Sequence, residues 1–225
     1  DGPYGLRCVD LSDPRHPRPL GAAYDMNYAF DVAIVGRRAY VAGAGAGLLI
    51  ADVSDPAHPC ELGTLDTPGY AYGVAIAGST AYVADGWEGL HVVDVADPAH
   101  PQETGNCRIP GWALGVTVMS SRAYVAAGVN GLRVIEVSNR TAPRELGAYE
   151  QVRLARRVAV TGNTAYVADP DQGLQAVNIS TSAIDEASPG CTSSDGLVLR
   201  VCRVLNDGGT ANPNTFKLVH LRLEW

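Results

Sequence analysis

The chain repeats one phrase five times at intervals of 42 residues. The copies read GLRCVDLSDPRHP, GLLIADVSDPAHP, GLHVVDVADPAHP, GLRVIEVSNRTAP and GLQAVNIS, and they begin at Gly5, Gly47, Gly89, Gly131 and Gly173. A constant period of this length is typical of repeat folds, in which each unit buries its apolar surface against its neighbours. The repeat therefore limits the chain to one continuous repetitive architecture over most of its length.

Each repeat contains four short runs rich in Val, Ile and Tyr, bounded by Gly, Pro and Asp, which predicts four β-strands. The first strands are expected at 31–36, 73–78, 115–120 and 157–162, and the second at 39–42, 81–84, 123–126 and 165–168. The third strand is the repeated phrase itself, and the fourth is the brief run before a pair that ends in glycine, at Leu20-Gly21, Leu62-Gly63, Thr104-Gly105 and Leu146-Gly147. Four strands per radially repeated unit predict an all-β fold, a β-propeller of four-stranded blades. Apolar and polar residues alternate little along the first and third strands, so we expect both strands to be buried on both faces.

The period divides the chain into two parts. Residues 1–180 hold about four and a half repeats, whereas 181–225 break the period and predict a loop followed by a β-hairpin. That tail either closes the ring or begins a second, truncated domain. The chain begins at Asp1 inside a repeat, so we expect the natural N-terminus upstream. The repeats form either an arc of a larger ring or a closed ring of four or five blades.

Charge and composition exclude several kinds of partner. The net charge is −7, Lys217 is the single lysine, and no dense basic cluster occurs, which argues against nucleic acid as a partner. No apolar run approaches the ~18 residues that a membrane helix needs, so membrane insertion within this chain is not expected. Five cysteines do not form a disulfide framework, although Cys191 and Cys202 could pair in an oxidising compartment.

Two polar columns of the repeat invite a metal hypothesis, but both have simpler explanations. His16, His58 and His100 occupy one turn per blade, and the rotation between blades should keep them apart. The third strands end in a polar column, and we expect its side chains to accept hydrogen bonds from the turn that follows. Its members are Asp10, Asp52, Asp94, Glu136 and Asn178. We therefore expect no metal site and no cofactor.

The most plausible binding surface follows from blade topology. The loop that enters the first strand and the loop that joins the second strand to the third lie at the same end of a blade. Their side chains differ between repeats, as recognition surfaces do, and aromatic residues dominate them. The candidate face comprises Tyr28, Phe30, Tyr70, Tyr72, Trp87 and Trp112, with the polar residues Asp85, Asp169, Arg156 and Arg157. In the alternative arrangement, the rings cap the channel or pack between blades.

The phrase GLHVVDVADPAHP, together with GV-x-V and AYVADG, resembles the LVIVD repeat of bacterial and archaeal surface or secreted proteins. The resemblance covers residues 1 to about 180. It implies a propeller that works outside the cytoplasm and has no recognised catalytic motif. The expected function is thus a non-catalytic interaction module that binds a protein or glycan through the aromatic loops. Two alternatives stay open, which are a structural spacer and a hydrolase or lyase with a site in the central channel at Asp31, Asp85, Asp169 and Arg157.

Overall fold

The computed structural model describes residues 5–23 and 28–180, and the backbone of 200–202. The strands in these ranges form one two-stranded sheet and four four-stranded antiparallel sheets. The two-stranded sheet pairs β1 (Leu6–Asp10) with β2 (Arg18–Ala23), and blade 1 contains β3 (Asp31–Val35), β4 (Arg38–Ala42), β5 (Leu48–Asp52) and β6 (Cys60–Leu65). Blade 2 contains β7 (Gly73–Ala77), β8 (Thr80–Ala84), β9 (Leu90–Asp94) and β10 (Gln102–Cys107). Blade 3 contains β11 (Gly115–Met119), β12 (Arg122–Ala126), β13 (Leu132–Glu136) and β14 (Arg144–Tyr149). Blade 4 contains β15 (Arg157–Thr161), β16 (Thr164–Asp169), β17 (Gly173–Asn178) and β18 (Arg200–Cys202).

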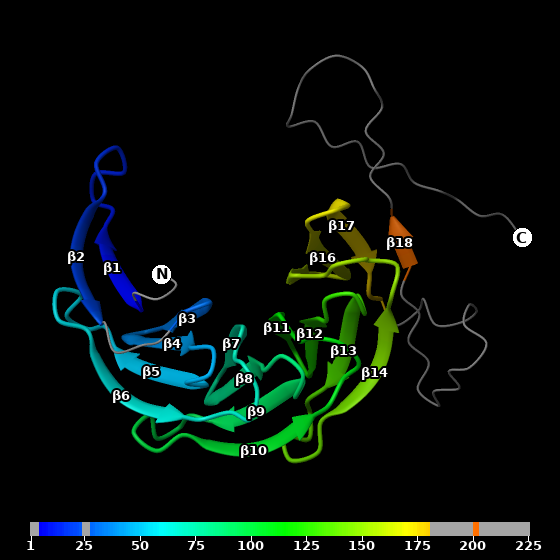
Figure 1. Ribbon diagram of the computed structural model, residues 1–225, viewed down its shortest axis with the longest axis horizontal. Coiled ribbons are helices and arrows are strands. Elements are labelled where there is room, and N and C mark those ends of the chain that lie inside the picture. The colour runs from blue at the N-terminus through cyan, green and yellow to red at the C-terminus, as the bar shows by residue number, and fades with distance from the viewer. Residues whose placement is uncertain (1–4, 24–27, 181–199, 203–225) are drawn as a thin grey trace, which may run out of the picture.

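The sheets lie side by side along an arc (Figure 1). The first strands β3, β7 and β11 lie on its concave side, and the fourth strands β6, β10 and β14 lie on its convex side (Figure 1). First strands of neighbouring blades contact one another, β3 with β7, β7 with β11, and β11 with β15. This arrangement confirms the predicted all-β propeller architecture with its four-stranded blades.

The core lies between neighbouring blades, and equivalent positions of the repeat contribute to it in each blade. Leu48, Leu90 and Leu132 open the third strands of blades 1 to 3 and are completely buried. The equivalent Leu174 of blade 4 is 57% exposed, because no described blade covers that side of its sheet. Burial of the leucine column therefore depends on the neighbouring blade, as expected for a fold that is stabilised unit against unit.

The prediction that first strands are buried on both faces is wrong. In β3, Val32 and Ile34 are 46% and 58% exposed, and in β7, Ile76 is only half-buried. A first strand lies on the concave side of the arc, where mainly the first strands of adjacent blades cover it (Figure 1). The third strands, which neighbouring sheets cover on both faces, do follow the prediction in blades 1 to 3.

The fourth strands extend further than the sequence indicates. We expected each to end before the pair that contains the repeated glycine, but β6 continues through Gly63 to Leu65, with a register shift between Ile50 and Ala51 of the paired strand. A Cβ on Gly63 would lie 2.5 Å from the carbonyl oxygen of Pro98, in the Asp-Pro turn of the next blade. The glycine thus allows a bulged strand to touch the neighbouring turn, and the strand does not end there.

The region after residue 180 is described only in part. Strand β18 pairs antiparallel with β17, with Ala176 opposite Cys202, and supplies the fourth strand of blade 4. The rest of the expected hairpin tail, including Cys191, lies outside the described residues, as do residues 24–27. Within the described ranges, no helix is long and apolar enough to cross a membrane.

Candidate ligand-binding face

Six aromatic side chains from the loops of blades 1 to 3 form one connected cluster, which we call the aromatic face. Phe30 contacts Tyr72 with ring centroids 4.9 Å apart, and Tyr72 contacts Trp112 at 5.8 Å. Trp87 meets Trp112 edge to face at 4.8 Å, while Tyr28 and Tyr70 extend the cluster through contacts of 6.4 Å with Phe30 and Tyr72. The six members are Tyr28, Phe30, Tyr70, Tyr72, Trp87 and Trp112. These distances are typical of favourable aromatic pairs.

Most of the aromatic face is accessible to solvent. Tyr70 and Trp87 are 57% and 68% exposed, and Tyr28 is 54% exposed. Phe30 and Trp112 are also exposed, whereas Tyr72 is half-buried at the centre of the cluster. Single exposed apolar residues are ordinary on protein surfaces, but a contiguous group of this size is characteristic of interaction sites.

Backbone bridges between blades hold the loops that carry the rings. Gly86, in the β8–β9 loop, exchanges two hydrogen bonds with Ala113, which enters β11, at 3.0 and 3.1 Å. This bridge brings Trp87, which follows Gly86, beside Trp112, which precedes Ala113. Equivalent bridges join Ala44 to Ala71 and Gly128 to Ala155. The loops are therefore part of an ordered rim, and the repeated small residues at these positions are the sequence signal for it.

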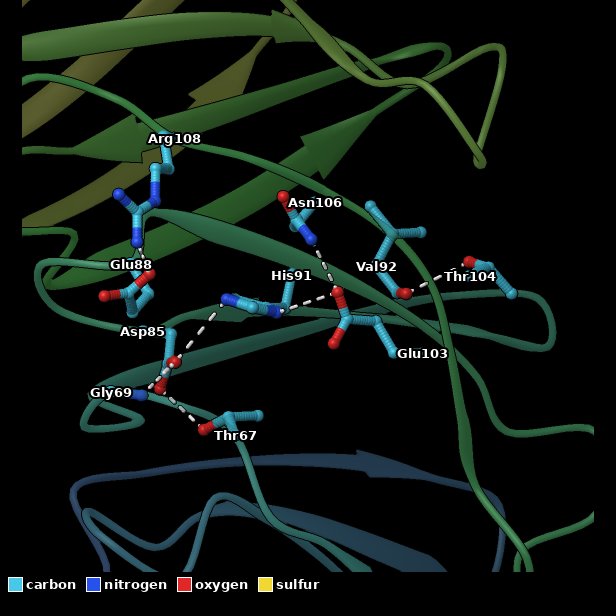
Figure 2. Close-up of polar contacts among 10 residues, drawn as sticks. All are labelled: Thr67, Gly69, Asp85, Glu88, His91, Val92, Glu103, Thr104, Asn106 and Arg108. Atoms are coloured by element: carbon cyan, nitrogen blue, oxygen red, sulfur yellow. Dashed lines mark hydrogen bonds and ion pairs between the residues drawn. The ribbon is translucent and has the colours of Figure 1, made fainter.

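Asp85 joins two of the loops that carry the aromatic face, through contacts with Thr67 and Gly69 (Figure 2). Its carboxylate is completely buried and accepts hydrogen bonds from the Thr67 hydroxyl at 2.6 Å and from the backbone N–H of Gly69 at 2.8 Å. Thr67 and Gly69 belong to the loop that carries Tyr70, while Asp85 itself precedes Trp87. Its position therefore fixes the relative placement of two rings, and the carboxylate does not line the exposed surface.

Asp169 has the equivalent position in blade 4 and is also buried. It accepts hydrogen bonds from the backbone N–H groups of Leu154, Asp171 and Gln172 at 2.8 to 3.0 Å. Desolvation opposes ionisation of Asp169, but these N–H donors outweigh it and lower the pKa of the carboxyl below its ordinary value. Of the ten predicted site residues, Asp85 and Asp169 thus support the loops.

His91, in strand β9, lies between two carboxylates (Figure 2). It is 3% exposed, with Nε2 3.6 Å from Asp85 Oδ2 and Nδ1 3.3 Å from Glu103 Oε1. Arg133 occupies the same column in blade 3 and pairs with Glu145 at 3.1 Å. Blades 2 and 3 therefore share one feature. In each, a nitrogen-bearing side chain of the third strand faces a glutamate of the fourth strand. The shared column of His91 and Arg133 was the available sequence signal.

Arg157 connects four blades at the inner edge of the aromatic face. From the start of β15, its Nη1 donates to the carbonyl oxygens of Leu114 and Tyr72 at 2.6 and 3.3 Å, and its Nη2 donates to that of Phe30 at 3.0 Å. These three residues occupy one column of the repeat, at the entry to the first strand of blades 1 to 3. The structure thus brings Arg157 to the aromatic residues, while the neighbouring Arg156 is exposed beside it.

The four residues considered for catalysis are engaged with the backbone. Asp31 accepts hydrogen bonds from the N–H groups of Val32 at 3.0 Å and Val74 at 3.2 Å. Asp85, Asp169 and Arg157 make the backbone hydrogen bonds described above. Within the described part of the chain, no hydrogen bond or ion pair joins any two of these four. General acid–base chemistry needs groups that converge on a reacting atom. The arrangement offers exposed rings and one guanidinium, which suit binding.

The repeated turns behave as local structures. His16, His58 and His100 each bond an aspartate of their own turn, as His100 Nδ1 does with Asp97 Oδ2 at 2.9 Å. The expected hydrogen bonds to the polar column are confirmed where the Ser12, Ser54, Ala96 and Ser180 N–H groups donate to it at 2.8 to 3.0 Å. Over residues 5–23 and 28–180, no group of three or more His, Cys, Asp or Glu side chains is arranged to hold a metal ion.

Comparison with solved structures identifies the fold. The chain is similar to a functionally unknown protein from Desulfotomaculum acetoxidans, with a TM-score of 0.66 and 18% identity over 80% of this chain and 60% of that one. It is also similar to the β-propeller domain of Myceliophteria thermophila Cps50 (Swd1), with a TM-score of 0.58 and 12% identity over 83% and 61% of the two chains. The computationally designed Ika4 protein matches with a TM-score of 0.55 and 8% identity over 68% of this chain and 91% of that one.

Sequence comparison gives one clear result. None of the curated protein sequences compared with the chain matches it. The family model described as the LVIVD repeat, in contrast, matches four times, at residues 27–67, 68–109, 110–151 and 153–187. These matches follow the blades and cover more than half of the chain, so the chain belongs to the LVIVD repeat family.

Proposed function

We propose that this propeller is a non-catalytic interaction module that binds a protein or glycan through the aromatic face. The observation that carries the proposal is the cluster of six contacting rings, among them Tyr70 and Trp87, each more than half exposed. Desolvating such rings against a ligand contributes much of the free energy in many interfaces, and Trp and Tyr are enriched among the residues that dominate binding.

The contrast between loops and strands supports the same function. The strands keep Leu, Val and Tyr in fixed columns because every blade must pack against the next one. The entering loops place Tyr28, Tyr70, Trp112 and Leu154 in a single column, so the residue at this position changes from blade to blade. A rigid scaffold that presents varied loops is the usual arrangement of a binding protein.

The proposed place of action is outside the cytoplasm, as part of a secreted or cell-surface protein. The support is the resemblance of the repeat to those of bacterial and archaeal surface and secreted proteins. Fractionation of the source cells with an antibody against the chain tests this part, and recovery from the cytoplasmic fraction alone contradicts it.

A binding screen on glycan and protein arrays tests the proposed face. The parent chain is compared with Tyr70→Ala and Trp112→Ala, which remove two exposed rings, and with Tyr166→Ala as a matched control. Tyr166 is 37% exposed on β16, outside the aromatic face. We expect the two face variants to lose the ligands that the parent and the control retain. Equal binding by all four proteins refutes the assigned face, and an absence of ligands for the parent favours a structural spacer.

A further inference from the structure

We infer that the ligand of the aromatic face is an acidic glycan whose uronate carboxylate binds the guanidinium of Arg157. This inference rests on the proposed function and specifies its ligand. It begins with the position of Arg157, whose guanidinium bonds the carbonyl groups of Phe30 and Tyr72, two residues of the aromatic face itself. A fixed positive charge therefore lies against the backbone of two residues that carry rings of the aromatic face.

Three bonds leave part of the guanidinium available. An arginine side chain has five N–H donors, and a planar pair of them can bind a carboxylate in a bidentate manner. The bonds to Leu114, Tyr72 and Phe30 use Nη1 twice and Nη2 once. The remaining N–H groups are one on Nε and one on Nη2, the two nitrogens that share one edge of the planar group. Arg157 is an exposed residue, so a ligand can reach its side chain.

The charge of Arg157 is not matched by a carboxylate in the described part of the chain. None of the ion pairs among residues 5–23 and 28–180 includes it, whereas Arg133, Arg108 and Arg144 each pair with a glutamate. The partners of Arg157 are carbonyl dipoles, which hold the group in place and leave its full charge. In a chain of net charge −7, this is a local positive site, and Arg156 beside it adds a second exposed cation.

The rings and the guanidinium together favour a sugar. The C–H face of a pyranose packs on an exposed aromatic ring while its hydroxyl groups stay in water, and a uronate adds a carboxylate at the ring edge. An extended peptide is more often bound by adding to a strand edge. In the rim of the aromatic face, the backbone groups of Ala44, Gly86 and Gly128 are already paired with Ala71, Ala113 and Ala155. The face therefore offers ring surfaces and a cation.

The test compares acidic and neutral forms of the same sugar. Titration calorimetry is carried out with oligogalacturonate, oligomannuronate and a glucuronate-containing oligosaccharide, each paired with its carboxyl-reduced counterpart. We expect the parent chain to bind at least one acidic form roughly 10- to 100-fold more tightly than its reduced form, the range that one charge-assisted bidentate contact provides. The preference should fall as salt is raised.

Two variants separate Arg157 from general positive charge. Arg157→Gln should lose the preference for the acidic sugar, whereas Arg15→Gln, which removes an exposed arginine in the β1–β2 turn outside the aromatic face, should keep it. Because Arg157 also joins blades, urea unfolding of each variant verifies folding. The comparison of acidic and reduced sugars on the parent chain does not depend on any variant.

Each result is decisive. Equal affinity for acidic and reduced sugars overturns the inference but leaves the proposed function intact, and so does binding of poly-glutamate without any sugar. If the chain binds none of the three uronates, the inference is overturned as well, and the array screen then decides the proposed function separately. An acidic preference that survives Arg157→Gln overturns the assignment to Arg157.

Discussion

Replacement of Asp85 by alanine should destabilise the chain far more than replacement of a similar aspartate at the surface. The buried carboxylate of Asp85 accepts hydrogen bonds from the Thr67 hydroxyl and the Gly69 N–H. Hydrogen bonds to a charged group contribute roughly 1.5–3 kcal/mol each, and donors left unsatisfied in the interior add to the cost. His91 also loses its neighbouring carboxylate. We expect a total loss of about 3–5 kcal/mol in the free energy of unfolding, the range found when one partner of a buried charged network is removed.

Urea unfolding followed by circular dichroism measures this difference, with Asp94→Ala as the matched control. Asp94 is exposed and makes one hydrogen bond, to the N–H of Ala96 at 3.0 Å. Its loss should change the free energy of unfolding by less than about 1 kcal/mol, as surface substitutions generally do. Equal destabilisation by the two variants refutes the role of Asp85 as the buried anchor of the loops. Asp85→Asn, which keeps the size and part of the hydrogen bonding, should fall between them.

The remaining predictions concern the core, the inner edge and the turns. Leu90→Ala should lower the free energy of unfolding by about 2–5 kcal/mol, whereas Leu174→Ala, in the same column but 57% exposed, should cost well under half as much by the same urea assay. Gly115→Ala should destabilise blade packing and lower the midpoint of thermal unfolding, because its Cβ would lie 2.8 Å from a backbone carbonyl oxygen of the next blade. Carboxyl NMR titration should place the pKa of Asp97 below its ordinary 3.8, chiefly because of the His100 side chain, and His100→Ala should raise it. Because that pKa is lowered in the folded chain, the stabilisation by Asp97 is present at neutral pH and is lost as the pH falls through and below 3.8.

The repeat made the blades predictable, since the leucine and tyrosine columns recur with one period and each strand has a turn signal on either side. Packing between blades determines where the fourth strands end, which the repeat pattern did not predict. The fourth strand runs past Gly63 because the turn at Pro98, 35 residues later, fits against that glycine. Local sequence around Gly63 contains no trace of that contact, and a Leu-Gly pair on its own indicates a strand end.

The candidate site was predictable in the same uneven way. Blade topology places the entering loops at one end, and the rings of Tyr70 and Trp112 do lie in one cluster. The burial of Asp85 could not be predicted, because it depends on donors 16 and 18 residues earlier in the chain, and the Thr67 hydroxyl has no counterpart in the next repeat, where Ile109 takes its place. The surroundings of His91 also depend on distant contacts, since its two carboxylate partners lie on a loop and on another strand.

Tryptophan fluorescence tests the central claim, that ligands bind the aromatic face, most directly. The chain has three tryptophans, so the Trp225→Phe variant emits only from Trp87 and Trp112, both in that face. With a ligand retained in the array screen, we predict that saturation shields both residues from acrylamide quenching and shifts their emission. Saturable binding by calorimetry with unchanged emission and unchanged quenching would contradict the account.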